Sequence, residues 1–481
     1  MKIKTRAAET AAVGAVQARS VELKRELGLF DLVLTQVMFI VGAQWVGTAA
    51  MLGHAQVFYW LLAMALFYLP QAAVVIHLNR LMPLEGGLYQ WAKLGFNDGV
   101  GFLVAWNLWV FALILLSSYG LVIADTFSYA LGPGAAWFTS TKWYDGAVTG
   151  FVVATIILVS LYGLRVGKWV HDAGGMAHLI TFGALLLMPL VAISHHAITN
   201  YHPFAVSVPR ASLLSVNIFS KLALGALTGF EYVAILAGET RDPGRAIGRS
   251  VMIATPIIAL MFILGTGAVL SATPIGKIDL IAPIPQALTL GLHSFGFAVY
   301  IVPVLTMLLL TRHIANVNLL FAANTRLPLV AGWDGLLPAW FTRLHPRFRT
   351  PLNSILFVGV VTLVFAAVSL LGVGLQEAFQ LLDSAAGILY AIAYLAMFAL
   401  PILGMRGFDR PPLWLRLAAG SGFAVTLLYI VFSLFPIIDV TSRGSFAGKI
   451  IAVVVGANLL GAAIYRAEKR RRAARANYIS G

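Results

Sequence analysis

Two apolar segments of the sequence are interrupted near their middles, the first by Gly42-Ala43-Gln44-Trp45-Val46-Gly47 and the second by Gly225-Ala226-Leu227-Thr228-Gly229-Phe230-Glu231. Each interruption carries two glycines, and backbone that leaves a helix inside a membrane must line a polar cavity or meet a ligand. Interrupted segments at matching places of two halves are typical of inverted-repeat transporters. The alternative is that these glycines only let neighbouring helices pack closely.

The composition of the chain indicates a membrane protein. Of its 481 residues, 60% are hydrophobic and 11% are charged, and its mean hydropathy is +0.87. These values are too apolar for a water-soluble enzyme. The absence of cysteine excludes disulfides, thiolate metal sites and thiol catalysis. We therefore expect an all-α polytopic membrane protein.

The apolar runs, separated at glycines, prolines and charge clusters, predict twelve membrane-spanning helices. Most of the runs have about 20 residues or more, enough to cross a hydrocarbon core about 30 Å thick. They lie near 29–54, 57–80, 97–131, 144–163, 170–194, 213–240, 250–272, 292–323, 352–371, 377–402, 413–436 and 447–465. The expected parts are an N-terminal tail (1–28), a first repeat of helices 1–5 (29–194), a second repeat of helices 6–10 (213–402), peripheral helices 11–12 (413–465) and a basic tail (466–481).

The chain is strongly basic, with 33 Lys and Arg against 19 Asp and Glu and a net charge of +14. In a multi-span protein such an excess follows from the retention of Lys and Arg on the cytoplasmic side and needs no nucleic-acid partner. Assigning the loops alternately to the two sides places most basic residues on the side of both termini. We predict a multi-pass plasma-membrane protein with cytoplasmic N- and C-termini, no signal peptide and contacts to lipid headgroups.

Three groups of motifs follow one another along the chain. They are Pro83-Leu84-Glu85-Gly86-Gly87-Leu88-Tyr89 with Gly101-Phe102-Leu103 and Trp106; Gly229-Phe230-Glu231 with Ala237-Gly238-Glu239, Asp242-Pro243 and Arg245; and Trp333-Asp334-Gly335-Leu336-Leu337-Pro338 with Phe341, His345-Pro346 and Thr350-Pro351. In this order they resemble the amino acid–polyamine–organocation (APC) superfamily of permeases. The resemblance covers essentially the whole chain.

The resemblance implies a LeuT-like fold, with a 5+5 inverted repeat and two extra C-terminal helices. It also implies secondary transport of amino acids or amines, driven by protons or by exchange. In that family the broken first helix binds the substrate carboxylate, which here points to Ile40, Val41, Gly42, Ala43 and Gln44. The broken sixth helix binds the amine, which points to Gly225, Ala226, Leu227, Thr228 and Gly229. Helix ends suit this task because they expose unpaired N–H groups at one end and carbonyls at the other.

Two residues depart from the family pattern. Gln44 stands where the third residue of the turn is usually glycine, and Gly225 stands where many members have an aromatic that closes over the substrate. We expect Trp45, next to Gln44, to restore part of the missing bulk. The substrate size is therefore not predicted by the resemblance.

Several ionisable residues fall inside the predicted spans, where a charge requires a partner, water or a changed protonation state. Glu231 is expected to hold the unwound sixth segment or to relay a proton; a structural carboxyl is the alternative. His178 titrates near neutral pH and is a candidate for proton coupling; a structural histidine is the alternative.

The remaining charged residues are given simpler interpretations. Asp383, Asp125 and Asp31 are expected to be interfacial or helix-capping carboxylates, and Arg312 with Asn316 and Asn318 to make polar helix contacts. A cytoplasmic salt-bridge gate is predicted from Glu239, Arg241, Asp242 and Arg245, with a plain topological loop as the alternative.

Other functional classes fit the sequence less well. No His-Glu-x-x-His, Gly-x-Ser-x-Gly or clustered carboxylate–histidine motif occurs, so we expect neither an enzyme nor a metal or cofactor. A receptor or channel is a remote alternative. A polyamine transporter is the closer one, but a substrate without a carboxylate should require acidic side chains in the pocket. The sequence thus favours amino acids as the substrate.

Overall fold

The computed structural model describes residues 28–82, 87–132, 134, 141–162, 165–195, 198, 201–207, 209, 211–230, 243–330, 343, 351–404 and 409–480. Within these ranges every regular element is a helix. Large apolar side chains such as Phe151, Met252 and Leu459 are exposed on the outside, as expected of surfaces that face lipid.

The first apolar segment forms two helices instead of one. Helix α2 (Leu29–Ile40) is capped at its start by Asp31, whose Oδ2 accepts the N–H of Gly28 at 2.8 Å. Helix α3 (Ala43–Ala50) follows after two residues, and its axis is bent by 54° from that of α2. The capping role expected for Asp31 is confirmed.

The next helices of the first half run over residues 53–194. A single span contains η1 (Gly53–Ala55), α4 (Gln56–Ala63), the π-helix η2 (Met64–Tyr68) and α5 (Leu69–Leu81). The short α6 (Leu88–Gly95) leads into α7 (Asp98–Leu131), whose N-cap Asn97 accepts the N–H of Val100. Helices α8 (Lys142–Tyr162) and α9 (Arg165–Ser194) follow.

The second interrupted segment begins with α10 (Leu213–Ser220), which continues as the π-helix η4 (Lys221–Ala226). Ser212 caps α10, since its hydroxyl accepts the N–H of Ser215 at 3.1 Å. Of the span expected at 213–240, the described part is therefore a short apolar helix that ends at Ala226.

The rest of the chain contains α12 (Pro243–Ala272), η6 (Ile275–Lys277), α13 (Pro283–Gly291), α14 (Ala298–Val330), α16 (Leu352–Ser369), α17 (Leu375–Leu403), α18 (Leu413–Phe432) and α19 (Arg443–Ser480). Helix α13 was not expected from the sequence. It has prolines at its first turn, where proline is tolerated, but it is too short to register as a span. Helix α19 continues through the basic segment predicted as a tail.

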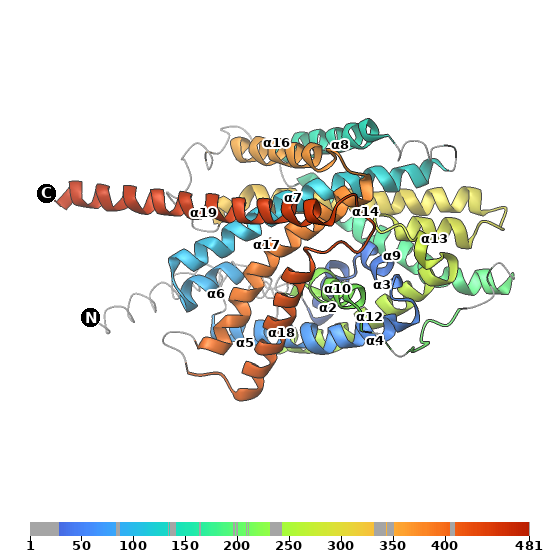
Figure 1. Ribbon diagram of the computed structural model, residues 1–481, viewed down its shortest axis with the longest axis horizontal. Coiled ribbons are helices and arrows are strands. Elements are labelled where there is room, and N and C mark those ends of the chain that lie inside the picture. The colour runs from blue at the N-terminus through green and yellow to red at the C-terminus, as the bar shows by residue number, and fades with distance from the viewer. Residues whose placement is uncertain are drawn as a thin grey trace.

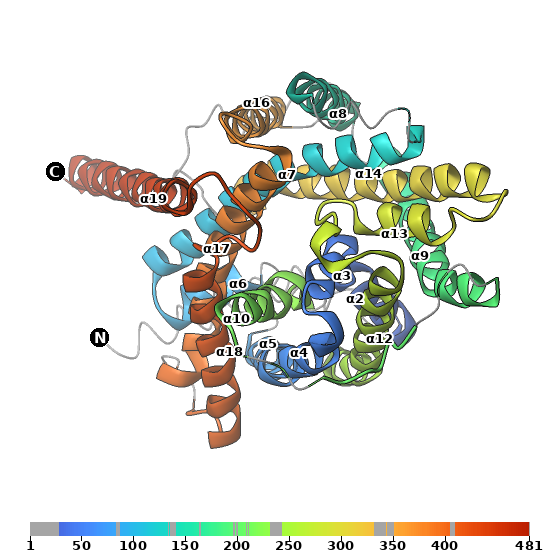
Figure 2. The ribbon, with the colours of Figure 1, turned by 45° about the vertical axis from the view of Figure 1, so that its right-hand side comes forward.

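Helices α7, α14 and α17 cross the middle of the molecule, where α7 contacts both α14 and α17, while α8 and α16 pack together at its edge (Figures 1 and 2). The broken helices α2–α3 and α10 lie together on the other side of this group, with α12 and α4 around them (Figure 2). The two breaks thus lie beside the long helices of the centre.

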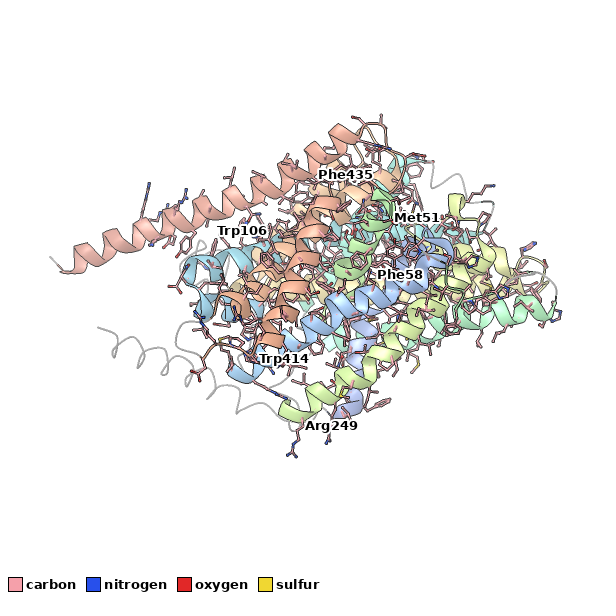
Figure 3. The ribbon with its side chains drawn as sticks, turned by 60° about the horizontal axis from the view of Figure 1, so that its bottom comes forward. Met51, Phe58, Trp106, Arg249, Trp414 and Phe435 are labelled. Atoms are coloured by element: carbon pink, nitrogen blue, oxygen red, sulfur yellow. The ribbon has the colours of Figure 1, made fainter. Side chains whose placement is uncertain are left out.

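Helix α19 lies along the outside and projects beyond the other helices toward the C-terminus (Figure 1). It is held to α7 by polar contacts: Asn107 and Asn458 exchange amide hydrogen bonds of 2.8 and 3.1 Å, and the Trp106 indole donates to the Ala457 carbonyl at 2.8 Å. Figure 3 shows Trp106 beside this helix, with Arg249 and Trp414 toward one end of the molecule and Phe435 toward the other.

By length and composition, the described residues contain ten helices that can cross a membrane, or eleven when α2 and α3 count as one broken span. The prediction of an all-helical, multi-pass membrane protein is confirmed. The finer prediction of twelve spans in a 5+5 arrangement stays a prediction.

Candidate functional site

The first break leaves a helix start facing the interior. Between α2 and α3, Val41 (φ −73°, ψ 89°) and Gly42 (φ −87°, ψ 135°) leave the helical conformation. The first backbone N–H groups of α3, at Ala43 and Gln44, are too early in the helix to have an intrahelical acceptor, and a helix N-terminus carries partial positive charge. This end can bind an anionic group.

The second break leaves a helix end. Beyond Ala226, Leu227 adopts φ −100° and ψ 10°, and Gly229 has φ +107°, a conformation that favours glycine. The N–H of Gly229 points to the Tyr394 hydroxyl at 3.4 Å. The last carbonyls of η4 lose their helical donors here, and they carry partial negative charge. This end can bind a cationic group.

A cavity of about 350 Å³ lies between the two breaks, a size typical of small-molecule sites. Eight of the residues predicted to bind substrate line it: Ile40, Gly42, Gln44, Trp45, Gly225, Ala226, Thr228 and Gly229. The other walls come from α7, α14, α17 and α18, with Phe111, Leu115, Tyr119, Asn316, Tyr390 and Tyr429 among the lining residues. Val41, Ala43 and Leu227 lie in the breaks as buried residues behind this surface.

Arg312 of α14 reaches into the first break. The buried guanidinium donates a hydrogen bond of 3.1 Å to the carbonyl of Val41, the first residue after α2. A permanent positive charge is thereby placed at the negative end of the α2 dipole. Arg312 also lines the cavity, so it takes part in the site as well as in the helix contact expected from the sequence.

His178 of α9 lies next to this arginine. The ring is completely buried, packs edge-on against Phe182 at 5.5 Å, and interacts with the Val41 carbonyl and with the charges of Arg312 and His313. Neither ring nitrogen has a hydrogen-bond partner of good geometry among the described residues. The structure therefore brings His178 to the first break, where a proton would add to the charge of Arg312.

A buried ion pair closes another side of the cavity. Lys221 of η4 lies with its Nζ 3.9 Å from Oδ2 of Asp383 and donates to the Ser384 hydroxyl at 3.1 Å. The ammonium also lies over the ring of Tyr429, 6.0 Å from its centre. The expectation that Asp383 is an interfacial or capping carboxylate is wrong: it stands in the third turn of α17 and lines the cavity.

Sequence reasoning missed Lys221 as a functional residue. The available signal was a charged residue inside an apolar span, four residues before the glycine break, which by itself indicates a buried function. Its partner is 162 positions away in sequence, and only the fold brings the two together.

Four of the predicted site residues lie outside the described part of the chain: Glu231, Glu239, Arg241 and Asp242. The relay role of Glu231 and the cytoplasmic gate stay predictions. Of the gate, Arg245 is described, and it is exposed in the first turn of α12. No group of three His, Cys, Asp or Glu that would hold a metal ion occurs among the described residues.

Comparisons of the sequence with known proteins match transporters. A sequence model of the amino acid permease family matches residues 27–457. An uncharacterized transporter of Legionella pneumophila is 26% identical over 388 residues, which cover 79% of this chain and 81% of the relative. A probable agmatine/putrescine antiporter of Lactococcus lactis is 21% identical over 376 residues, 78% of each chain. A branched-chain amino acid permease of Bacillus subtilis is 22% identical over 388 residues, 76% of this chain and 80% of the relative.

Proposed function

The chain belongs to the amino acid permease family of the APC superfamily, and we propose that it carries amino acids across the membrane by alternating access. Its family and relatives are transporters or permeases, not enzymes. The proposal concerns what the family leaves open, namely the substrate, the coupling and the layout of the helices.

One observation carries the amino-acid assignment: a helix start and a helix end open onto the same cavity. An α-amino acid has a carboxylate and an ammonium group a few ångströms apart. The N–H groups of Ala43 and Gln44 suit the carboxylate, and the carbonyls before Leu227 suit the ammonium group. Gly42 and Gly225 to Gly229 allow the backbone to approach the substrate this closely.

A polyamine or other organic amine is the second candidate, because the Lactococcus relative is a probable agmatine/putrescine antiporter. A substrate without a carboxylate would need acidic groups in the central cavity. The carboxylate that lines it in the described part of the chain, Asp383, is already paired with Lys221. Glu231 is the other acid expected here from the sequence. Because Asp383 is paired, it is not free to bind the ammonium group of a diamine, and this supports an amino acid over a diamine as the substrate.

For the driving force we propose a proton or an exchanged solute. We assign the proton to His178, and its position beside the carbonyl of Val41 at the first break supports this assignment. A proton on this ring would repel Arg312 and weaken its bond to the same carbonyl. Binding of a proton would thereby change the contact that holds the first break. Glu231 is proposed as the second member of the relay.

We propose a LeuT-like arrangement of twelve spans, in which 29–194 and 213–402 are inverted repeats and 413–465 adds two peripheral helices. The two breaks fall at the start of each proposed repeat. The excess of Lys and Arg in alternate loops supports cytoplasmic termini and residence in the plasma membrane. The group Glu239, Arg241, Asp242 and Arg245 would then form the cytoplasmic gate.

The proposal is tested on the purified full-length protein. Thermal stabilisation is measured across the proteinogenic amino acids, putrescine and spermidine, because a ligand that binds the folded state raises its stability. The best ligand is then used for uptake into proteoliposomes with and without an inward proton gradient. We expect stabilisation by an α-amino acid that weakens when its carboxylate is amidated, because the central cavity then loses one of its two contacts.

The contrary result is stabilisation by putrescine or spermidine alone. That result would overturn the amino-acid assignment and favour the amine transporter. Saturable flux would separate a carrier of either kind from a channel.

A further inference from the structure

A second cavity, of about 690 Å³, lies at the end of the molecule opposite the C-terminus of α19. It is formed by the last turns of α7, the start of α17, and the segments that precede α13 and α19. Four acidic residues line it: Asp125, Asp279, Glu377 and Asp439. No lysine, arginine or histidine lines it within the described ranges. Such a pocket concentrates cations.

Two of the four carboxylates have structural partners. Asp279 accepts hydrogen bonds from the backbone N–H groups of Ile281 and Ala282, from the Tyr129 hydroxyl at 3.0 Å and from the Gln376 amide at 2.7 Å. Glu377 lies in the first turn of α17, where negative charge is favourable, and accepts the N–H of Thr441. These two groups shape the cavity.

Asp125 differs from both. Only 4% of this residue is exposed, and its Oδ2 has no hydrogen-bond partner among the described residues. Its closest charged neighbours are also acids, Asp279 and Asp145. Asp145 of α8 is itself buried, with Oδ1 unpartnered in the described part of the chain. Burying a carboxylate without a positive partner is costly, and either a proton shared with the neighbouring Asp279 or a bound cation relieves this cost.

We propose that Asp125, with Asp279 beside it, binds the ammonium group of the transported solute and makes this cavity an outer binding site. The inference rests on the proposed function in one respect, that the solute carries an ammonium group. Such a group offers several N–H donors, which match the free Oδ2 of Asp125 and the neighbouring oxygens. A metal ion fits less well, because the described residues contain no group of three ligands for one.

The outer cavity lies directly along the helices that form the central one. On α7, Tyr119 lines the central cavity and Asp125 the outer cavity; on α17, Asp383 and Glu377 do the same. Each pair is six residues apart, which corresponds to about 9 Å along a helix. The two cavities are therefore stacked between the same two helices.

Helix α3 also links the central cavity to the outer cavity. Its N-terminal residues line the central cavity, and at Gly47 it packs so closely on the outer segment that a Cβ atom would lie 2.6 Å from Cβ of Pro283 and 3.3 Å from the carbonyl oxygen of Asp279. A contact of this kind lets a solute at Asp125 influence the first break. Figure 1 shows α13, which follows this segment, next to α3.

The test measures binding of putrescine and butylamine, two amines without a carboxylate, by thermal stabilisation of the purified full-length protein. It uses the Leu115→Trp background, because Leu115 lines the central cavity and the larger side chain narrows it. We expect saturable stabilisation that weakens about tenfold or more in apparent affinity in Asp125→Asn. Asp439→Asn is the matched control: it removes the same charge from the same cavity at an exposed position, and we expect less than about a twofold change.

A second measurement does not require a change at Asp125. Because the chain has no cysteine, Thr441→Cys introduces a single thiol at the exposed rim of the outer cavity. A cationic methanethiosulfonate reagent should modify it faster than an anionic one, and putrescine should slow the reaction in the Leu115→Trp background.

Three results would overturn the inference: no amine stabilisation in the Leu115→Trp background, equal losses in Asp125→Asn and Asp439→Asn, or no protection of the Thr441→Cys thiol by putrescine. A change in pH dependence without amine binding would mean that Asp125 holds only a proton, which also overturns it. Failure of amino-acid uptake by the wild type would instead contradict the proposed function, so the two are distinguishable.

Discussion

The indole ring of Trp45 lies directly against Gly225, so that a Cβ atom at position 225 would come within 2.8 Å of the ring carbons Cζ2 and Cζ3. The opposite edge of the same ring lies against Gly42, where a Cβ atom would be 2.6 Å from Cδ1 and 3.0 Å from Nε1. One side chain in the wall of the central cavity therefore contacts both breaks, and both glycines leave the room that its ring occupies.

Gly225→Ala is expected to lower the apparent substrate affinity about tenfold or more. The added methyl group must displace Trp45, and overpacking of this kind costs about 1–3 kcal/mol, with tenfold in affinity for each 1.4 kcal/mol. The measurement is the concentration dependence of uptake. Trp45→Leu in the same protein should restore part of the loss, because neighbouring changes are not additive. Gly248→Ala, where no atom lies within 4 Å of the new carbon, should have no effect.

Lys221→Met is expected to destabilise the protein by about 3 kcal/mol, because it leaves Asp383 as a buried charge without its partner. The double variant Lys221→Met/Asp383→Leu should recover most of this loss, since replacing a buried pair by apolar residues is often neutral. Thermal unfolding in detergent measures both. Equal stability of the single and double variants would show that the pair contributes nothing to the fold.

Arg312→Gln is expected to reduce the initial uptake rate about tenfold or more. It removes the charged hydrogen bond to the Val41 carbonyl, and such bonds contribute about 1.5–3 kcal/mol. Arg312→Lys keeps the charge but not the planar geometry, so it should recover only part of the rate. Arg443→Gln, an exposed arginine at the start of α19, is the matched control. Wild-type uptake by Arg312→Gln would contradict a role for this contact.

The sequence was sufficient to predict where the helices are interrupted. Glycine lowers helix propensity and opens space for the backbone, and at Gly42 and Gly229 the structure has the predicted breaks. The long apolar runs were likewise sufficient to predict an all-helical, multi-pass membrane protein, because a membrane imposes a minimum length on each span. Rules that depend only on neighbouring residues were therefore sufficient to predict the backbone breaks that line the central cavity.

Such rules could not predict the partners of the buried charged residues. Lys221 meets Asp383, and Arg312 meets the carbonyl of Val41, across 162 and 271 positions of sequence. Spacing within one helix carries no information on either contact. The π-helix at Lys221–Ala226 was also missed, since it changes the hydrogen-bond pattern without a distinct residue pattern.

His178→Gln is expected to remove the pH dependence of uptake while the protein still folds and binds substrate. A proton carried at His178 would enter with the substrate down its own gradient, so uptake by the wild type should fall as the external pH is raised from about 6 to 8 at a fixed internal pH. Glutamine keeps a polar group at the buried position beside Arg312 and the Val41 carbonyl but binds no proton, and its uptake should be nearly constant over this range. His195→Gln, an exposed histidine just beyond α9, should keep the wild-type profile. An unchanged profile in His178→Gln would place the proton site elsewhere, with Glu231 as the next residue to replace.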